Sequence, residues 1–178
     1  NVFVLGPTFQ NTANRLASYA ARQGKRSIVV VYDQNPAGEL GRRSIEAALI
    51  RSGITVAGMV GYEFSQEGVI NAVPQIATAV EDSGADAIFL TADTAGALPY
   101  LAQLLPEAGV DPATTTFMGL TRWDIPPGTL NLPGVQGGWF ALPDPALSDQ
   151  FVARYTGAYG GPPHPIAGLA YDGIAAIG

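Results

Sequence analysis

Polar side chains that could bind a ligand or perform chemistry follow three apolar runs of the sequence. Asp33 and Asn35 come directly after Ser27–Tyr32, an uncharged run typical of a strand that is covered on both faces. The other candidates lie at or after the ends of the runs Asp86–Thr91 and Thr115–Leu120. Side chains of these types could hold a metal ion, accept a phosphoryl group or hydrogen-bond a small polar ligand. The candidate set is Asp33, Asn35, Thr91, Asp93, Thr121, Trp123 and Asp124, with Tyr62 and Glu63 as a weaker fourth group.

The spacing of these residues does not favour catalysis. Asp33, Asp93 and Asp124 could form a magnesium cluster, but a phosphoryl-accepting aspartate needs a second acid beside it, and Asp33 is followed by two amides. The sequence has no GxxxxGK phosphate loop and no GxGxxG dinucleotide motif. It has no cysteine, and its single histidine, His164, lies among prolines without an evident triad partner. We therefore predict a protein that is not an enzyme and that uses neither a metal nor a cofactor.

Each candidate also has a structural interpretation. Asp33, Asp93 and Thr94 could cap the helices that follow them, an interpretation that we favour for Thr94. Trp123 could cover a hydrophobic core, and Asp124 could form a solvated ion pair with the arginine two positions before it. A binding function is favoured instead by the expectation that all the candidate loops leave the same edge of one sheet.

That expectation comes from apolar runs of strand type that alternate with segments of helical periodicity. The alternation predicts an α/β fold, a parallel sheet of five or six strands with helices on both faces, in which the carboxyl ends of the strands share one edge. The expected strands are Val2–Leu5, Ser27–Tyr32, Ile54–Val60, Asp86–Thr91, Thr115–Leu120 and Gly137–Leu142. The expected helices are Gln10–Gln23, Gly38–Ser52, Val69–Ser83, Thr94–Ala108, Leu147–Tyr159 and Ile166–Ile177, with the third regular only from about Asn71 so that Pro74 falls in its first turn.

The composition excludes some partners. Hydrophobic residues make up 47% of the 178 residues and charged residues 13%, which is enough for a sizeable core. The net charge of −6 leaves no basic face for nucleic acid. No apolar run reaches the length of a membrane span. The absence of cysteine removes disulfides but leaves the compartment open.

Four segments, taken in order, resemble the type I periplasmic binding proteins, in particular the branched-chain amino acid receptors. They are NVFVLGPTFQNTANRLASYAARQGKRSIVVVYDQNPAGELG, DAIFLTADTAGALPYLAQLLPEAG, FMG and YTGAYGGPPHPIAGLAYDGIAA. The resemblance implies two flavodoxin-like, Rossmann-like lobes joined by a hinge, with a small ligand clamped between them. It implies that residues 1–143 are the carboxy-side lobe and that residues 144–178 are helices that cross towards the other lobe. The protein would then be periplasmic and would deliver an amino acid or related molecule to the permease of an ABC transporter.

The sequence departs from the amino acid receptors at three places. Ala37 stands where the family often has an aromatic residue, and Thr94-Ala95 stand where it often has another. After the third segment the family often has an acid for the ligand ammonium, whereas this chain has Thr121, with Asp124 three residues later. These departures argue against a free α-amino acid as the ligand.

A second branch of the same fold offers an alternative. The segment FMGLTRWDIPPGTLNLPGVQGGWFALPDP is similar to the binding-protein-like lipoproteins that activate peptidoglycan-synthesising penicillin-binding proteins. This resemblance implies a lipid-anchored protein whose partner is a peptidoglycan synthase in the membrane. In either case we expect the apolar faces of the last two helices to pack on the lobe or to form a homodimer; they carry Phe151, Tyr155, Ile166, Leu169 and Ile174.

Overall fold

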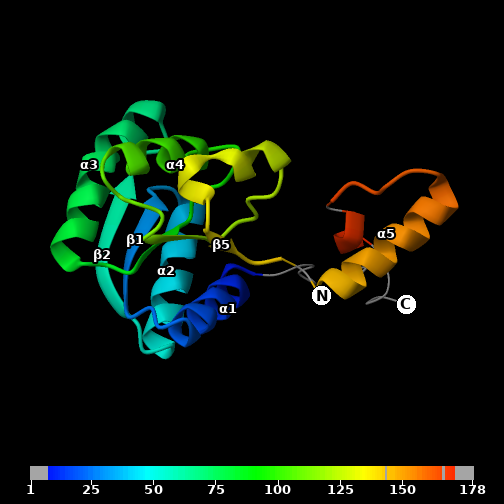
Figure 1. Ribbon diagram of the computed structural model, residues 1–178, viewed down its shortest axis with the longest axis horizontal. Coiled ribbons are helices and arrows are strands. Elements are labelled where there is room, and N and C mark those ends of the chain that lie inside the picture. The colour runs from blue at the N-terminus through cyan, green and yellow to red at the C-terminus, as the bar shows by residue number, and fades with distance from the viewer. Residues whose placement is uncertain (1–7, 143, 166, 171–178) are drawn as a thin grey trace. The chain divides into compact units, whose positions relative to one another are not determined.

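The computed structural model describes residues 8–142, 144–165 and 167–170, and the chain divides into two compact units (Figure 1). The larger unit consists of residues 8–141 and contains the sheet. The described residues of the smaller unit are 142, 144–165 and 167–170. All the candidate site residues belong to the larger unit.

Five strands form the sheet in the described part of the chain, and every pair of neighbours is parallel. Their order across the sheet is β2-β1-β3-β4-β5. Residues Ile28–Val31 of β1 are 0% exposed because this strand is covered on both faces, as its uncharged sequence indicates. The predicted α/β parallel sheet is therefore confirmed. The strands are β1 (Ser27–Asp33), β2 (Thr55–Tyr62), β3 (Ala87–Leu90), β4 (Thr116–Gly119) and β5 (Trp139–Phe140).

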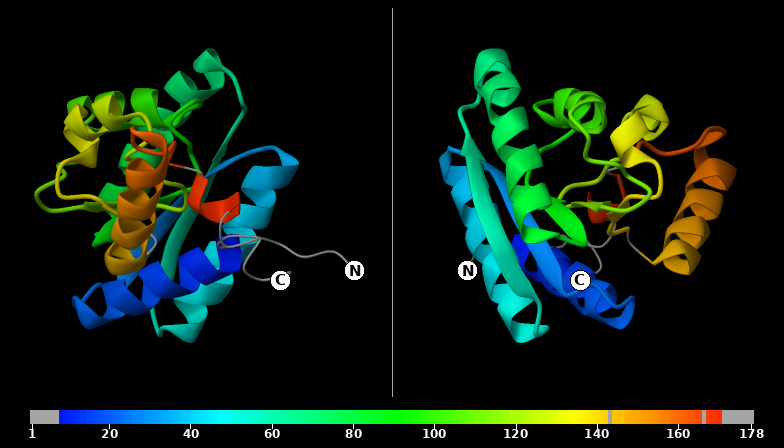
Figure 2. Two further views of the ribbon diagram at one scale, coloured as in Figure 1. Left: turned by 90° about the vertical axis from the view of Figure 1, so that its right-hand side faces the viewer. Right: turned by 60° about the vertical axis from the view of Figure 1, so that its left-hand side comes forward.

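Helices cover both faces of this sheet, as the two views of Figure 2 show. The helices are α1 (Phe9–Arg22), α2 (Pro36–Arg51), α3 (Gln66–Ser83) and α4 (Leu98–Glu107). On one face, α1 and α2 pack around Ile28 and Val30 of β1; on the other, α3 and α4 pack around Val29 and Val31. Successive side chains of β1 enter opposite cores because a strand alternates its side chains between its two faces.

Ordinary capping signals set the boundaries of these helices. The side chains of Thr8, Asn35 and Ser65 each accept a hydrogen bond from a first-turn backbone N–H of α1, α2 and α3. Gly24 and Gly53 follow α1 and α2 with φ of 81° and 69°, a conformation that glycine adopts without strain. The predicted helices Gln10–Gln23 and Gly38–Ser52 are confirmed to within a few residues.

The predicted start of the third helix is wrong. We expected regular helix from about Asn71, whereas α3 already begins at Gln66 because Ser65 caps it. Pro74 consequently lies in the interior of the helix, where its ring removes one backbone hydrogen bond. The burial of Val69 and of other apolar residues of α3 outweighs this local loss.

The predicted start of the fourth helix is also wrong, and so is the assignment of Thr94 as its cap. Helix α4 begins at Leu98 after a turn in which the backbone N–H of Gly96 donates to the Asp93 carbonyl at 3.3 Å. The Thr94 hydroxyl instead donates to the Ile125 carbonyl at 2.6 Å. Thr94 therefore joins two loops at the edge of the sheet.

Two further boundaries differ from the predicted ones. Tyr62, which we placed in a loop, is the last residue of β2, and β5 is shorter than the predicted Gly137–Leu142. The proline-rich segment before β5 is not all loop, because it contains the 3₁₀ helices η1 (Pro127–Asn131) and η2 (Pro133–Val135).

The smaller unit contains α5 (Pro145–Tyr159), which begins at the cap residue Asp144. The rings of Phe151, Tyr155 and Tyr159 follow one another along this helix, with centroids 5.9 and 4.6 Å apart. Residues 167–170 are helical, and the rest of the predicted helix Ile166–Ile177 lies outside the described residues, as does the predicted strand Val2–Leu5. Within the described part of the chain, every helix is too short or too polar to cross a membrane.

Candidate functional site

The chain changes direction across the sheet next to β1, and the candidate loops meet at this point. From β1 the chain runs through α2 to β2 on one side, whereas β3 lies on the other side of β1 and leads through α4 to β4. Because α2 and α4 cover opposite faces, the loops after β1 and β3 lead away from this point to opposite sides of the sheet. In open parallel sheets, ligands bind at such a switch point, outside the carboxyl ends of the strands.

Hydrogen bonds link the loops that follow β1, β3 and β4. The backbone N–H of Asp33 donates to the hydroxyl of Thr91 at 3.1 Å, and the hydroxyl of Thr121 donates to the Ala92 carbonyl at 3.2 Å. The prediction that these loops share one edge of the sheet is thereby confirmed. The further prediction that their side chains contact a ligand stays a prediction.

Asp33 is the most unusual residue of this edge. Its Oδ1 atom is buried and has no hydrogen-bond partner. Burial, followed by the negative charge of nearby Asp93, raises the pKa of Asp33 to about 6, and an interaction with the Asn35 side chain opposes the shift. A carboxylate left in this state could accept a hydrogen bond from a molecule that binds at this edge.

Replacing Asp33 with asparagine is expected to stabilise the fold more at neutral pH than in acid. Because folding raises the pKa of Asp33, its charged form opposes folding, and this penalty grows as the pH rises from about 4 to about 6. The gain in free energy of unfolding should therefore be larger at about pH 7.5 than at about pH 4. Urea denaturation of both proteins at the two pH values measures it. Equal gains at both would show that Asp33 is not perturbed.

Asn35 has a structural role in addition to any contact with a ligand. Its Oδ1 accepts a hydrogen bond from the backbone N–H of Gly38 at 2.8 Å and so caps α2. A Cβ atom at Gly38 would lie 2.1 Å from the Asp33 carbonyl oxygen, so this turn requires glycine. The cap and the glycine together hold the loop after β1 tightly against the end of the strand.

Trp123 lies in the core, in agreement with the structural interpretation of this residue. It is 0% exposed, and its ring packs 6.0 Å from that of Phe140, measured between centroids. Its indole Nε1 is buried and has no hydrogen-bond partner. The indole therefore supports the loop after β4 from within and does not present its face to solvent.

Asp124 is engaged by a neighbouring base. The Nε of Arg122 donates to its Oδ1 at 2.9 Å, and this hydrogen bond lowers the pKa of Asp124. The predicted pair is thus present, although both side chains are partly buried. No three described side chains of histidine, cysteine, aspartate or glutamate are grouped so that they could hold a metal ion.

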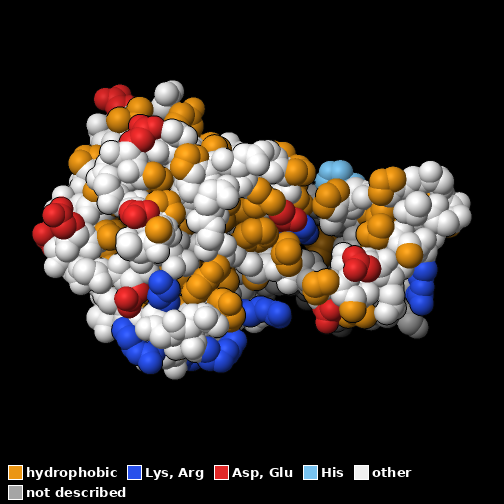
Figure 3. Space-filling model, in the orientation of Figure 1, with side chains coloured by type: hydrophobic (Ala, Val, Ile, Leu, Met, Phe, Trp, Pro, Cys, Tyr) orange, Lys and Arg blue, Asp and Glu red, His pale blue; other side chains and the backbone are white. Residues whose placement is uncertain are grey.

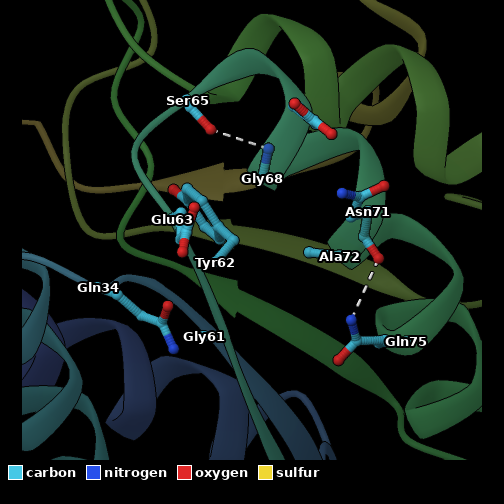
Figure 4. A pocket seen from close by; sticks show the side chains of 10 residues that line it. Gln34, Gly61, Tyr62, Glu63, Ser65, Gly68, Asn71, Ala72 and Gln75 are labelled. Carbon is cyan, nitrogen blue, oxygen red and sulfur yellow. Dashed lines mark hydrogen bonds between the residues drawn. The ribbon is translucent and has the colours of Figure 1, made fainter.

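A polar pocket of about 400 Å³ lies beside this edge, at the end of β2 (Figure 4). Gln34, Glu63 and Ser65 line it from the loops, and Asn71 and Gln75 line it from α3. Of these residues, only Glu63 is among the weaker candidates from the sequence, and the amide side chains of Gln34, Asn71 and Gln75 were not predicted. A periodic signal was available, because Asn71 and Gln75 are one helical turn apart on the helix that follows β2.

Acidic groups dominate the charge of the candidate edge. Asp33 ends β1, Glu63 and Asp93 follow β2 and β3, and Arg122 is paired with Asp124. Figure 3 shows carboxylate atoms at the upper end of the larger unit, where α3 begins, and most Lys and Arg atoms at its lower end. The electrostatics of this edge therefore favour a ligand group that donates hydrogen bonds or carries positive charge.

Solved structures of known proteins share this fold. A substrate-binding protein of an ABC transporter from Desulfitobacterium hafniense matches with a TM-score of 0.74 and 23% identity, over 98% of this chain and 49% of its own. A putative branched-chain amino acid ABC transporter protein from Rhodospirillum rubrum matches with a TM-score of 0.72 and 19% identity, over 97% and 49%. A solute-binding protein from R. palustris in complex with benzoate gives 0.63 and 17%, over 93% and 45%.

This chain thus spans about half the length of the solved structures that it matches. A comparison with curated protein sequences found no match. A protein-family model described as periplasmic binding protein matches residues 1–178. The ordered sequence segments, the doubly wound parallel sheet and this match agree, and the chain belongs to the periplasmic binding protein family.

Proposed function

We propose that the chain is one lobe of a non-catalytic solute-binding protein and that the edge at β1 and β3 is its wall of the ligand site. The unpartnered, buried Oδ1 of Asp33 at the switch point carries this proposal. A buried acceptor without a hydrogen bond destabilises a fold, so such groups commonly have a functional reason. A donor group of the ligand would satisfy this oxygen, and Asp93 would offer a second acceptor beside it.

The seven candidates divide into two roles within this proposal. Polar groups of the three loops contact the ligand, and the remaining residues hold the loops in place through the contacts described above. The proposed contacts are Asp33, Asp93, Thr121 and Asp124, and the proposed positioning residues are Asn35, Thr91 and Trp123.

The ligand class follows from the relatives. One similar structure is a complex with Leu, and another is a complex with benzoate. We therefore infer a small organic molecule, bound in the periplasm between this lobe and a second one and passed to the permease of an ABC transporter. Lipid anchoring and a homodimer through the last helices remain predictions from the sequence.

The activator function remains an alternative, with less support. The segment that resembles the activators is partly internal, because Val135 is buried and a Cβ atom at Gly134 would lie 2.7 Å from the Ala102 carbonyl oxygen. Packing therefore accounts for part of this segment without any protein partner. A full-length protein that binds no small molecule but binds a peptidoglycan synthase would favour the alternative.

The full-length protein should be screened by thermal shift with the standard amino acids, benzoate and hydroxybenzoates, followed by calorimetry of the best compound. We expect a rise in Tm and a Kd on the order of micromolar. Asp93→Asn should weaken binding about tenfold, whereas Asp82→Asn in the last part of α3 should not. A panel without any binder, or binding insensitive to both Asp33→Asn and Asp93→Asn, would contradict the proposal.

A further inference from the structure

An apolar groove of about 210 Å³ opens on the same edge of the sheet as Asp33 and Asp93, here called the acidic pair. The loop after β2 and the turn after β3 form it, so it lies among the carboxyl ends of the strands. The rings of Phe64 and Tyr100 line it together with Val69 and the small residues 95–97. Phe64 is 63% exposed and Tyr100 is 42% exposed, so a ligand can reach both rings.

The groove and the acidic pair meet at Gly96. A Cβ atom at this residue would lie 2.9 Å from Oδ1 of Asp93 and 3.1 Å from Cε2 of Phe64. The carboxylate and the edge of the aromatic ring therefore approach the same point of the backbone. A side chain at this position would clash with both groups, so glycine allows the carboxylate and the ring to lie side by side.

Anions find few partners at this end of the sheet. Arg122 is bound to Asp124, and Arg42 of α2 is bound to Glu39 and Glu46. These are the arginines in the described loops after the strands and in the first seven residues of the helices that follow them; the next residue of α2, Arg43, is exposed. A ligand carboxylate beside Asp33 and Asp93 would thus find the guanidinium groups of Arg42 and Arg122 already paired with carboxylates.

The amino end of α4 offers few free backbone N–H groups that could bind an anion. The backbone N–H groups of Gly96 and Leu98 already donate to the Asp93 carbonyl, at 3.3 and 3.1 Å. The next residue, Pro99, has no N–H to donate. The helix end therefore offers an anion fewer free donors than an ordinary helix start.

We propose that this lobe binds an organic cation, with a protonated amine at Asp33 and Asp93 and the attached ring or branched alkyl group in the groove between Phe64 and Tyr100. A cavity of about 150 Å³ is enough for benzene, so the groove can accept one ring. An ammonium beside the Phe64 ring gains a cation–π attraction in addition to its contact with the carboxylates. The inference rests on the proposed function, because it names the ligand class of the same site.

Three test compounds examine this proposal by calorimetry on the full-length protein. Phenethylamine carries both groups, 3-phenylpropanoate replaces the amine with a carboxylate, and ethylamine lacks the ring. We expect phenethylamine to bind at least about tenfold more tightly than either of the others, a difference of about 1.4 kcal/mol. Equal or tighter binding of 3-phenylpropanoate would overturn the inference.

Variants locate the two parts of the subsite. Phe64→Ala and Gly96→Ala should each weaken phenethylamine binding several-fold, and Asp93→Asn should remove the preference for the amine over the carboxylate. Ile50 is 66% exposed and lies at the far end of α2. Ile50→Ala should therefore leave binding unchanged. Phenethylamine binding that is insensitive to Phe64→Ala would overturn the assignment of the groove.

The failure of the inference can be told from that of the proposed function. If leucine or benzoate binds and phenethylamine does not, the organic-cation inference is wrong while the solute-binding function stands. If none of the test compounds and no member of the amino acid and benzoate panel binds, both are wrong.

Discussion

Replacing Gly119 with alanine is expected to lower the free energy of unfolding of the lobe by about 3 kcal/mol, at the upper end of the usual range for overpacking. The new Cβ atom would lie 2.2 Å from Cε2 and 2.3 Å from Nε1 of Trp123. This indole is fully buried and packs against Phe140, so any shift of the ring must displace its neighbours in the core. Either β4 or the loop that the indole supports must shift. A shift of that loop would disturb the hydrogen bond from the Thr121 hydroxyl to the Ala92 carbonyl.

Gly58 supplies the matched control, because it is also a strand glycine. Its Cβ atom would lie 3.8 Å from Ala79 and 3.9 Å from Val29, which are ordinary contacts. Gly58→Ala should therefore be neutral or slightly stabilising in the same urea titration. A Gly119→Ala protein as stable as the wild type would show that the Trp123 ring does not occupy the position described here.

The second large effect concerns the ligand: this chain alone is expected to bind about a thousandfold more weakly than the full-length protein. The similar structures are about twice as long, since this chain covers 49% of the first of them, and a ligand held between two lobes contacts both. If the full-length protein binds at about micromolar, roughly −8 kcal/mol, half of the contacts leave about −4 kcal/mol, which is millimolar.

Calorimetry of residues 1–178 and of the full-length protein with the same compound measures this difference. Circular dichroism of the shorter chain should be recorded first, so that weak binding is not confused with loss of the fold. Micromolar binding by residues 1–178 would contradict the need for a second wall and would place the whole site within this lobe.

Local sequence signals were sufficient for most of the fold. The uncharged run Ser27–Tyr32 predicted the central strand because a strand buried on both faces needs no polar side chains. The predicted start of a helix was wrong where a capping residue and a proline gave opposite signals. Ser65 starts α3 well before Pro74, since tertiary packing of the apolar face offsets the bond that the proline removes.

The edge of the sheet could be predicted, but not the role of each side chain on it. The positions of Asp33 and Asp93 follow from topology alone, whereas the burial of Trp123 depends on the close approach of Gly119. The groove between Phe64 and Tyr100 leaves no sequence pattern, because it depends on how α3 and α4 pack side by side. Local hydrophobic periodicity does not reveal contacts between two helices that are distant in the sequence.

The most direct measurement is a crystal structure of the full-length protein with the tightest compound from the binding screen. We expect a ligand donor atom within hydrogen-bond distance of the Asp33 or Asp93 carboxylate, at the carboxyl ends of β1 and β3. A ligand bound elsewhere, with both carboxylates in contact only with solvent, would contradict it.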